Sequence, residues 1–139
     1  AAVIEMLQKP GRRFLLLGGP GEESIAEKIC KIMAQPPIDI VGRTTVAEAL
    51  ALISRCGLFL SNDSGLMHVA AALRVPQVAL FGSTDPRKTS PLNDKAVIIY
   101  PKEISCTPCF KSECAEDLEC MKAITVHEVY AAAEKVLIM

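Results

Sequence analysis

Five short apolar runs, the first four of them separated by stretches with helical spacing, limit what this chain can fold into. The runs that we expect to be strands cover residues 13–19, 38–42, 58–62, 77–82 and 96–101. Strands that alternate with helices of about a dozen residues are typical of βαβ units with right-handed crossovers. The sequence therefore predicts an α/β fold, in which helices flank a Rossmann-like parallel sheet.

Two helix starts carry a recognisable capping pattern. Thr45 and Thr125 are each followed three residues later by a glutamate, Glu48 and Glu128, which is the spacing of a capping box. Apolar residues at helical spacing predict the buried faces of two earlier helices, Ile25, Ile29, Ile32 and Met33 in one and Val46, Ala49, Leu50 and Ile53 in the other.

Bulk composition excludes several classes of protein. The chain has 139 residues, enough for one domain, and is 50% hydrophobic but only 4% aromatic. Its formal net charge is −1 and it has no basic run, so we expect no nucleic-acid partner. No apolar run approaches the roughly 18 residues of a transmembrane helix, and no signal peptide is visible. We expect a cytoplasmic protein.

Three loops should meet at the carboxyl edge of the predicted sheet, where open α/β sheets bind ligands. They are "GGPGEES" (18–24), "SNDSGLMH" (61–68) and "FGSTDP" (81–86). Each combines small residues, which allow a ligand close to the backbone, with acidic or hydroxyl side chains. We therefore expect the ligand site to lie among these loops.

The loop at 61–68 carries the most specific signal. We expect Asp63 to be the N-cap of the helix that follows. The backbone amides of Ser64, Gly65 and Leu66 would then form an anion site at the start of that helix. His68 lies four residues after Ser64, on the same side of the helix, and is either a ligand contact or a core histidine.

The other two loops leave alternatives open. The first has no GxGxxG motif, and its Glu22 would either accept hydrogen bonds from a ribose or stabilise a helix start. The third contains Thr84 and Asp85, which would either close over a ligand or form an ordinary Asp-Pro turn.

Four cysteines fall within the irregular stretch 102–123, at Cys106, Cys109, Cys114 and Cys120. Four thiols could surround a structural Zn²⁺ or an iron–sulfur cluster, although only one C-x2-C pair is present. Reduced thiols and disulfides are the alternatives, and in a cytosolic protein stable disulfides are the less natural state.

The motifs "GGPGEES", "VGRTTVAEALALI", "SNDSGLMHVAAAL" and "VPQVALFGSTDP" together resemble one family. From about residue 12 onward the chain is similar to the C-terminal half of glycosyltransferase family 9, the ADP-heptose:lipopolysaccharide heptosyltransferases, in particular type II. The resemblance implies the GT-B arrangement, two Rossmann-like domains facing a cleft, with the nucleotide-sugar donor held by the C-terminal one. Several type II enzymes carry a similar Cys-rich stretch.

The resemblance also implies a role for each matching residue. Asp63 would bind hydroxyl groups of the donor heptose, and the amides of residues 64–66 would hold the diphosphate, with His68 beside them. Glu22 would contact the ribose, and Thr44 would line the adenine pocket. No metal cofactor is required on this account, and no DxD triplet is present to bind one.

The expected domain is therefore the nucleotide-sugar-binding half, spanning residues 1–139, with the acceptor domain and its catalytic base missing. The expected partners are ADP-heptose as donor and the lipopolysaccharide core as acceptor, reached through the missing N-terminal domain. We expect the chain alone not to turn over. We also expect a strand of this domain to be missing before Ala1, so that the sheet pairs with a substitute strand or forms a dimer. The full protein would work in the cytoplasm, at or near the inner membrane.

Overall fold

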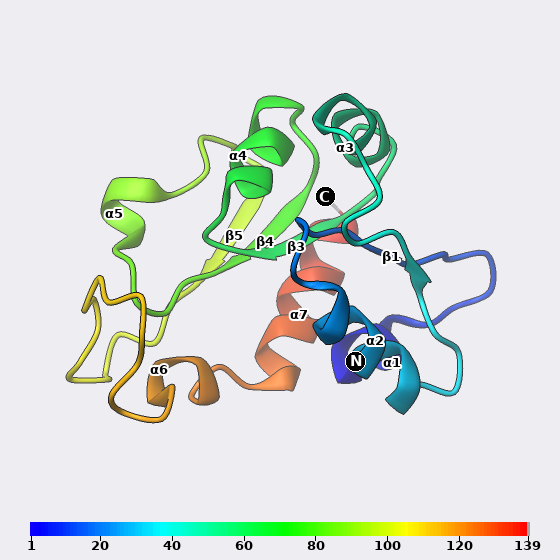
Figure 1. Ribbon diagram of the computed structural model, residues 1–139. Coiled ribbons are helices and arrows are strands. Elements are labelled where there is room, and N and C mark those ends of the chain that lie inside the picture. The colour runs from blue at the N-terminus through cyan, green and yellow to red at the C-terminus, as the bar shows by residue number, and fades with distance from the viewer. Residues whose placement is uncertain (139) are drawn as a thin grey trace. The chain divides into compact units, whose positions relative to one another are not determined.

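The computed structural model describes residues 1–138 and divides into two compact units (Figure 1). The N-terminal unit comprises Ala1–Leu52, and the C-terminal unit begins at Ile53. Each unit contains its own parallel sheet with helices packed beside it, which confirms the predicted α/β class. None of the helices in the described range is long and apolar enough to cross a membrane.

The N-terminal unit is built around a two-stranded parallel sheet. Its elements are α1 (Ala2–Leu7), β1 (Leu15–Leu16), α2 (Glu23–Ile32), β2 (Ile38–Asp39) and α3 (Val46–Ile53), of which only the last residue of α3 belongs to the C-terminal unit. Leu15 pairs with Ile38 and Leu16 with Asp39. The strands are therefore shorter than the apolar runs that predicted them.

The capping box at the start of α3 is confirmed. The Thr45 N–H donates to a Glu48 carboxylate oxygen over 2.8 Å, and the Glu48 N–H donates to the Thr45 hydroxyl over 3.3 Å. Ala49 and Ile53 are buried on this helix, whereas Val46 at its first turn is 77% exposed. The predicted apolar face of α3 is thus correct beyond its first residue.

The predicted apolar face of α2 is only partly correct. Met33 is buried at the end of the helix, but Ile25 and Ile32 are 57% and 71% exposed. Ala26 supplies the buried position instead. Ile25 and Ile32 are seven residues apart and therefore share one side of α2, about a third of a turn from the side that Ala26 buries.

The C-terminal unit is built around a three-stranded parallel sheet with the order β3–β4–β5. Its elements are β3 (Phe59–Asn62), α4 (Gly65–Ala72), β4 (Gln77–Leu80), α5 (Pro86–Thr89), β5 (Ala96–Ile99), α6 (Glu119–Lys122) and α7 (Val126–Leu137). All three strands coincide with predicted runs. The predicted irregular stretch 102–123 is confirmed apart from the short α6.

Helices cover both faces of this sheet (Figure 1). On the face beneath α4, Met67, Ala79 and Phe81 form a fully buried cluster, against which Ile98 and Tyr100 pack. α7 packs on β4 and β5 and buries Val129, Ala133 and Val136. The hydroxyl of Thr125 caps α7 by accepting the Glu128 N–H over 3.2 Å, as its sequence pattern predicts. A rigid core thus supports the loops at the carboxyl edge of this sheet.

Candidate functional site

Two of the predicted loops lie side by side at the carboxyl edge of the three-stranded sheet. β3 and β4 pair in parallel up to Asn62 and Leu80, so the residues that follow each strand emerge next to each other. The pairing continues one residue further, because the Asp63 N–H donates to the Leu80 carbonyl over 3.2 Å. Asp63 and Phe81 therefore begin two neighbouring loops.

The N-cap of α4 is Ser64, so the prediction that Asp63 caps this helix is wrong. Ser64 has extended backbone angles, and its hydroxyl accepts the Met67 N–H over 3.4 Å. Because the Asp63 N–H is still engaged in the sheet, the chain turns into the helix one residue later than the sequence suggested. The Asp63 carboxylate does not cap the helix and makes a different contact.

That contact is a hydrogen bond from Thr89 at the end of α5. Its hydroxyl donates to the Asp63 Oδ2 atom over 2.9 Å, across 26 residues of sequence. Asp63 is half-buried, and within residues 1–138 its Oδ1 atom accepts no hydrogen bond. One carboxylate oxygen is thus fixed in place, and the other faces no partner of the chain.

The first turn of α4 presents unpaired amides, as predicted. The N–H groups of Gly65 and Leu66 have no acceptor in the described part of the chain, since the first turn of a helix provides none. A Cβ atom added to Gly65 would meet no atom within 4 Å, and its φ is not positive. The fold therefore does not require glycine at this position.

His68 lies on the exposed surface of α4, three residues after Gly65. The alternative that it is a buried core histidine is thereby excluded. A residue three positions on shares a helix face with Gly65, so the imidazole can reach a ligand bound at the start of α4.

The loop after β4 is held by its own contacts. Asp85, 3% exposed, is the N-cap of α5 and accepts the Arg87 N–H over 3.0 Å. The Arg87 guanidinium also binds this carboxylate, over 2.8 Å at its closest, and together these bonds lower the pKa of Asp85. Pro86 follows Asp85 in the first turn of α5. Thr84 beside it is half-buried.

In the N-terminal unit, Glu22 and Thr44 follow β1 and β2 respectively. The loops that hold them are joined by a hydrogen bond from the Gly42 N–H to the Gly18 carbonyl, over 3.1 Å. The Glu22 carboxylate is exposed and accepts the Gly19 N–H over 2.7 Å. Thr44 is half-buried. Both residues therefore lie at the carboxyl edge of the two-stranded sheet.

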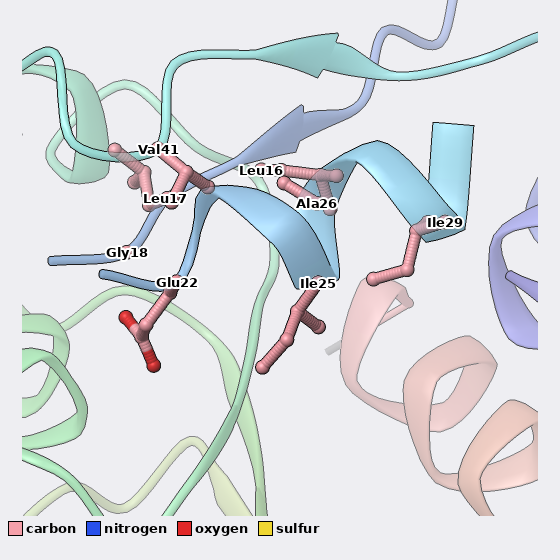
Figure 2. A pocket seen from close by; sticks show the side chains of 8 residues that line it. All are labelled: Leu16, Leu17, Gly18, Glu22, Ile25, Ala26, Ile29 and Val41. Atoms are coloured by element: carbon pink, nitrogen blue, oxygen red, sulfur yellow. The ribbon is translucent and has the colours of Figure 1, made fainter. Parts of the chain in front are cut away.

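A small apolar cavity lies between α2 and this sheet (Figure 2). Its volume is about 110 Å³, and aliphatic side chains such as Leu16, Ile29 and Val41 line it. In Figure 2 the Glu22 carboxylate points away from this aliphatic group. Glu22 is also one of the lining residues, and because its carboxylate points away from the aliphatic side chains, a ligand held by that carboxylate would lie outside the apolar interior.

The four cysteines of the segment 102–123 are free and differ in exposure. Cys120 is buried and Cys114 is exposed, and the Cys114 sulfur accepts the N–H groups of Glu116 and Leu118 over 3.4 and 3.1 Å. Burial raises the pKa of the Cys106 thiol, and the other three thiols of the segment raise it further. Across residues 1–138 no three His, Cys, Asp or Glu side chains are arranged to hold a metal ion.

Residues 1–119, which include every candidate donor-binding residue, match the family model described as glycosyltransferase family 9 (heptosyltransferase). The chain belongs to glycosyltransferase family 9. The resemblance predicted from the D-S-G-L-M-H and F-G-S-T-D-P motifs is therefore confirmed.

Members of family 9 with known names and structures are similar to most of this chain. Lipooligosaccharide heptosyltransferase 2 of Haemophilus influenzae is 40% identical over 103 residues, which is 71% of this chain and 30% of the relative. The structure of Escherichia coli ADP-heptose lps heptosyltransferase II covers 98% of this chain with 27% identity and a TM-score of 0.81. A family 9 structure from Veillonella parvula covers the same share with a TM-score of 0.83.

These family 9 proteins are much longer than the chain. It spans 39% of both solved structures and 30% of the Haemophilus relative. The similarity therefore concerns one part of a larger architecture.

One contact of the candidate site was missed from the sequence. Thr89 stands in an unremarkable "RKTSP" stretch, and no local pattern connects it with Asp63. The only available signal is topological, since α5 follows the strand next to β3. That signal places the two segments near each other without identifying the threonine.

Proposed function

We propose that this chain binds the nucleotide-sugar donor in a glycosyltransferase that moves heptose from ADP-heptose to the inner core of lipopolysaccharide. The observation that carries the proposal is the open first turn of α4. It presents two unpaired amides and a glycine that the fold does not need, next to a half-buried carboxylate. The names of the similar heptosyltransferases support the choice of sugar.

On this proposal the amides of Gly65 and Leu66 bind the diphosphate, because unpaired N–H groups at a helix start attract negative charge. The negatively charged Asp63 carboxylate is repelled by the diphosphate, so its position needs a compensating interaction. It accepts hydrogen bonds from hydroxyl groups of the sugar, which offsets that repulsion. His68 lies within one turn of the diphosphate and contacts it from the exposed face of α4.

The remaining donor contacts come from the other predicted residues. Glu22 accepts hydrogen bonds from the ribose hydroxyls, and Thr44 lines the adenine pocket. Thr84 bounds the site at the loop after β4, and Asp85 contributes by holding that loop in place. The amides of α4 favour the departing ADP, since they point to where negative charge develops as the glycosidic bond breaks. We assign no catalytic base to residues 1–139.

The acceptor and the base belong, in this proposal, to a part of family 9 proteins that the chain does not match. The 139 residues then form one nucleotide-sugar-binding domain, and the complete protein works in the cytoplasm beside the inner membrane. Pairing of two copies through the short sheets is part of the same proposal.

The cysteines support a second proposal, a structural Zn²⁺ held by Cys106, Cys109, Cys114 and Cys120. Thiolates suit zinc, and two backbone N–H groups already donate to the Cys114 sulfur, as they would to a thiolate ligand. The segment would have to close around the ion, because no metal-binding arrangement exists among residues 1–138. A metal-bearing interaction module is the alternative function that this observation favours.

One experiment separates these functions. The zinc and iron content of the protein is measured first. The chain is then titrated with ADP, UDP and GDP by calorimetry, and we expect the tightest binding for ADP. We expect at least a tenfold preference, since Thr44 and its surroundings would recognise the base. Tighter binding of UDP or GDP would indicate a different nucleotide sugar. Stoichiometric metal without any nucleotide affinity would contradict donor binding and support the interaction module.

A further inference from the structure

The Asp63 carboxylate is oriented by a residue of the helix α5. Within residues 1–138, its one hydrogen-bonding side-chain partner is the Thr89 hydroxyl, 2.9 Å from Oδ2. An ionised carboxylate only accepts hydrogen bonds, so the hydroxyl must donate its single proton to it. The carboxylate can then no longer rotate freely, and its Oδ1 atom remains available to a ligand.

Thr89 is well suited to hold that position. The alternative acceptor for its hydroxyl, the Asp85 carbonyl, lies further away at 3.4 Å. A hydrogen bond to a charged acceptor is also stronger than one to a neutral carbonyl. In addition, the β-branched side chain of threonine has few χ1 rotamers, so little freedom is lost when it points at Asp63.

The short helix that carries Thr89 is fixed at its start. Asp85 caps it, and the ion pair between Asp85 and Arg87 closes the same turn. The Thr89 N–H donates to the Asp85 carbonyl over 3.3 Å, which ties the last residue of α5 to this cap. The buried Asp85 therefore determines where the Thr89 hydroxyl lies.

The Cys-rich segment 102–123 braces the loop that leads into α5. The Phe110 N–H donates to the Ser83 carbonyl over 2.8 Å, and the Thr107 hydroxyl donates to the Gly82 carbonyl. Gly82 is packed so closely against this segment that an added Cβ would lie 2.6 Å from the Met121 sulfur. The start of this loop is thus held both by the sheet and by this segment.

We propose that Thr89 is a positioning residue for the donor sugar, acting through Asp63 and held in place by the Asp85–Arg87 turn. The inference rests on the proposed function, because it assumes that Asp63 binds the sugar. It adds a consequence that the proposed function does not contain. Loss of the Thr89 hydroxyl should weaken binding of the sugar and leave binding of the nucleotide diphosphate unchanged.

Titration calorimetry with ADP-heptose and with ADP tests this consequence. In Thr89→Val, which keeps the shape of the side chain, we expect the affinity for ADP-heptose to fall about five- to tenfold, the size of one hydrogen bond. The affinity for ADP should stay within twofold of the unmodified chain. Thr89→Ser should restore most of the loss, because it restores the donor.

Ser90→Ala is the matched control, since its hydroxyl donates to the Pro86 carbonyl in the same turn and does not contact Asp63. It should bind both ligands as the unmodified chain does. An unchanged ratio of the two affinities in Thr89→Val, whether both fall together or neither falls, overturns the inference while donor binding stands. If the unmodified chain binds neither ligand, the proposed function itself is wrong and the inference with it.

Discussion

Gly65→Val should lower the affinity for ADP about 100-fold or more without unfolding the chain. The valine side chain would occupy the space in front of the Gly65 and Leu66 amides, where the diphosphate is proposed to bind. Loss of two charge-assisted hydrogen bonds is expected to cost about 3 kcal/mol or more, which corresponds to roughly that factor. Titration calorimetry with ADP measures the change directly.

The fold itself should tolerate this substitution. An added Cβ at Gly65 has no neighbour within 4 Å and no backbone strain arises there. Thermal unfolding of Gly65→Val should therefore match that of the unmodified chain within a few degrees. Gly65→Ala is the graded control, with the same stability and a smaller loss of affinity. Unchanged ADP affinity in Gly65→Val would contradict the amide site at the start of α4.

Asp63→Ala should lower the affinity for the nucleotide sugar without lowering the affinity for the nucleotide. We expect the affinity for ADP-heptose to fall tenfold to 100-fold, because a charged acceptor of sugar hydroxyls is removed. The affinity for ADP should stay equal or rise slightly, since a negative charge next to the diphosphate disappears. Calorimetry with the two ligands compares these effects in one variant.

Asp63→Asn is the control for shape. The amide oxygen can still accept the Thr89 hydroxyl, so the local geometry is retained while the charge is lost. Its affinity for ADP-heptose should lie between those of Asp63→Ala and the unmodified chain. A loss of ADP affinity in Asp63→Ala as large as the loss of ADP-heptose affinity would contradict the assignment of Asp63 to the sugar.

Local patterns predicted the elements of this fold well. Each of the expected apolar runs contains a strand, and the Thr45 and Thr125 caps form as their spacing indicates. These features depend on neighbouring residues, so the sequence contains them directly. The exposed Ile25 and Ile32 were mispredicted because the side of α2 that is buried depends on tertiary packing, which local spacing does not determine.

Several features of the candidate site depend on contacts between distant segments, which local sequence patterns do not predict. Asp63 and Ser64 are adjacent, and both are good N-cap residues, so the sequence alone cannot choose between them. The choice is made by strand pairing, which holds the Asp63 N–H on Leu80 and moves the cap to Ser64. The Thr89 contact and the packing of Met121 on Gly82 likewise join segments that are far apart in sequence.

The central claim is that the backbone amides at the start of α4 bind a diphosphate. Amide chemical shifts in ¹⁵N–¹H correlation spectra, recorded while ADP is added, test it at the level of single N–H groups. We predict that the largest shifts occur at Gly65 and Leu66. Saturable ADP binding that leaves these two amides unmoved, with the largest shifts elsewhere in the chain, would contradict it.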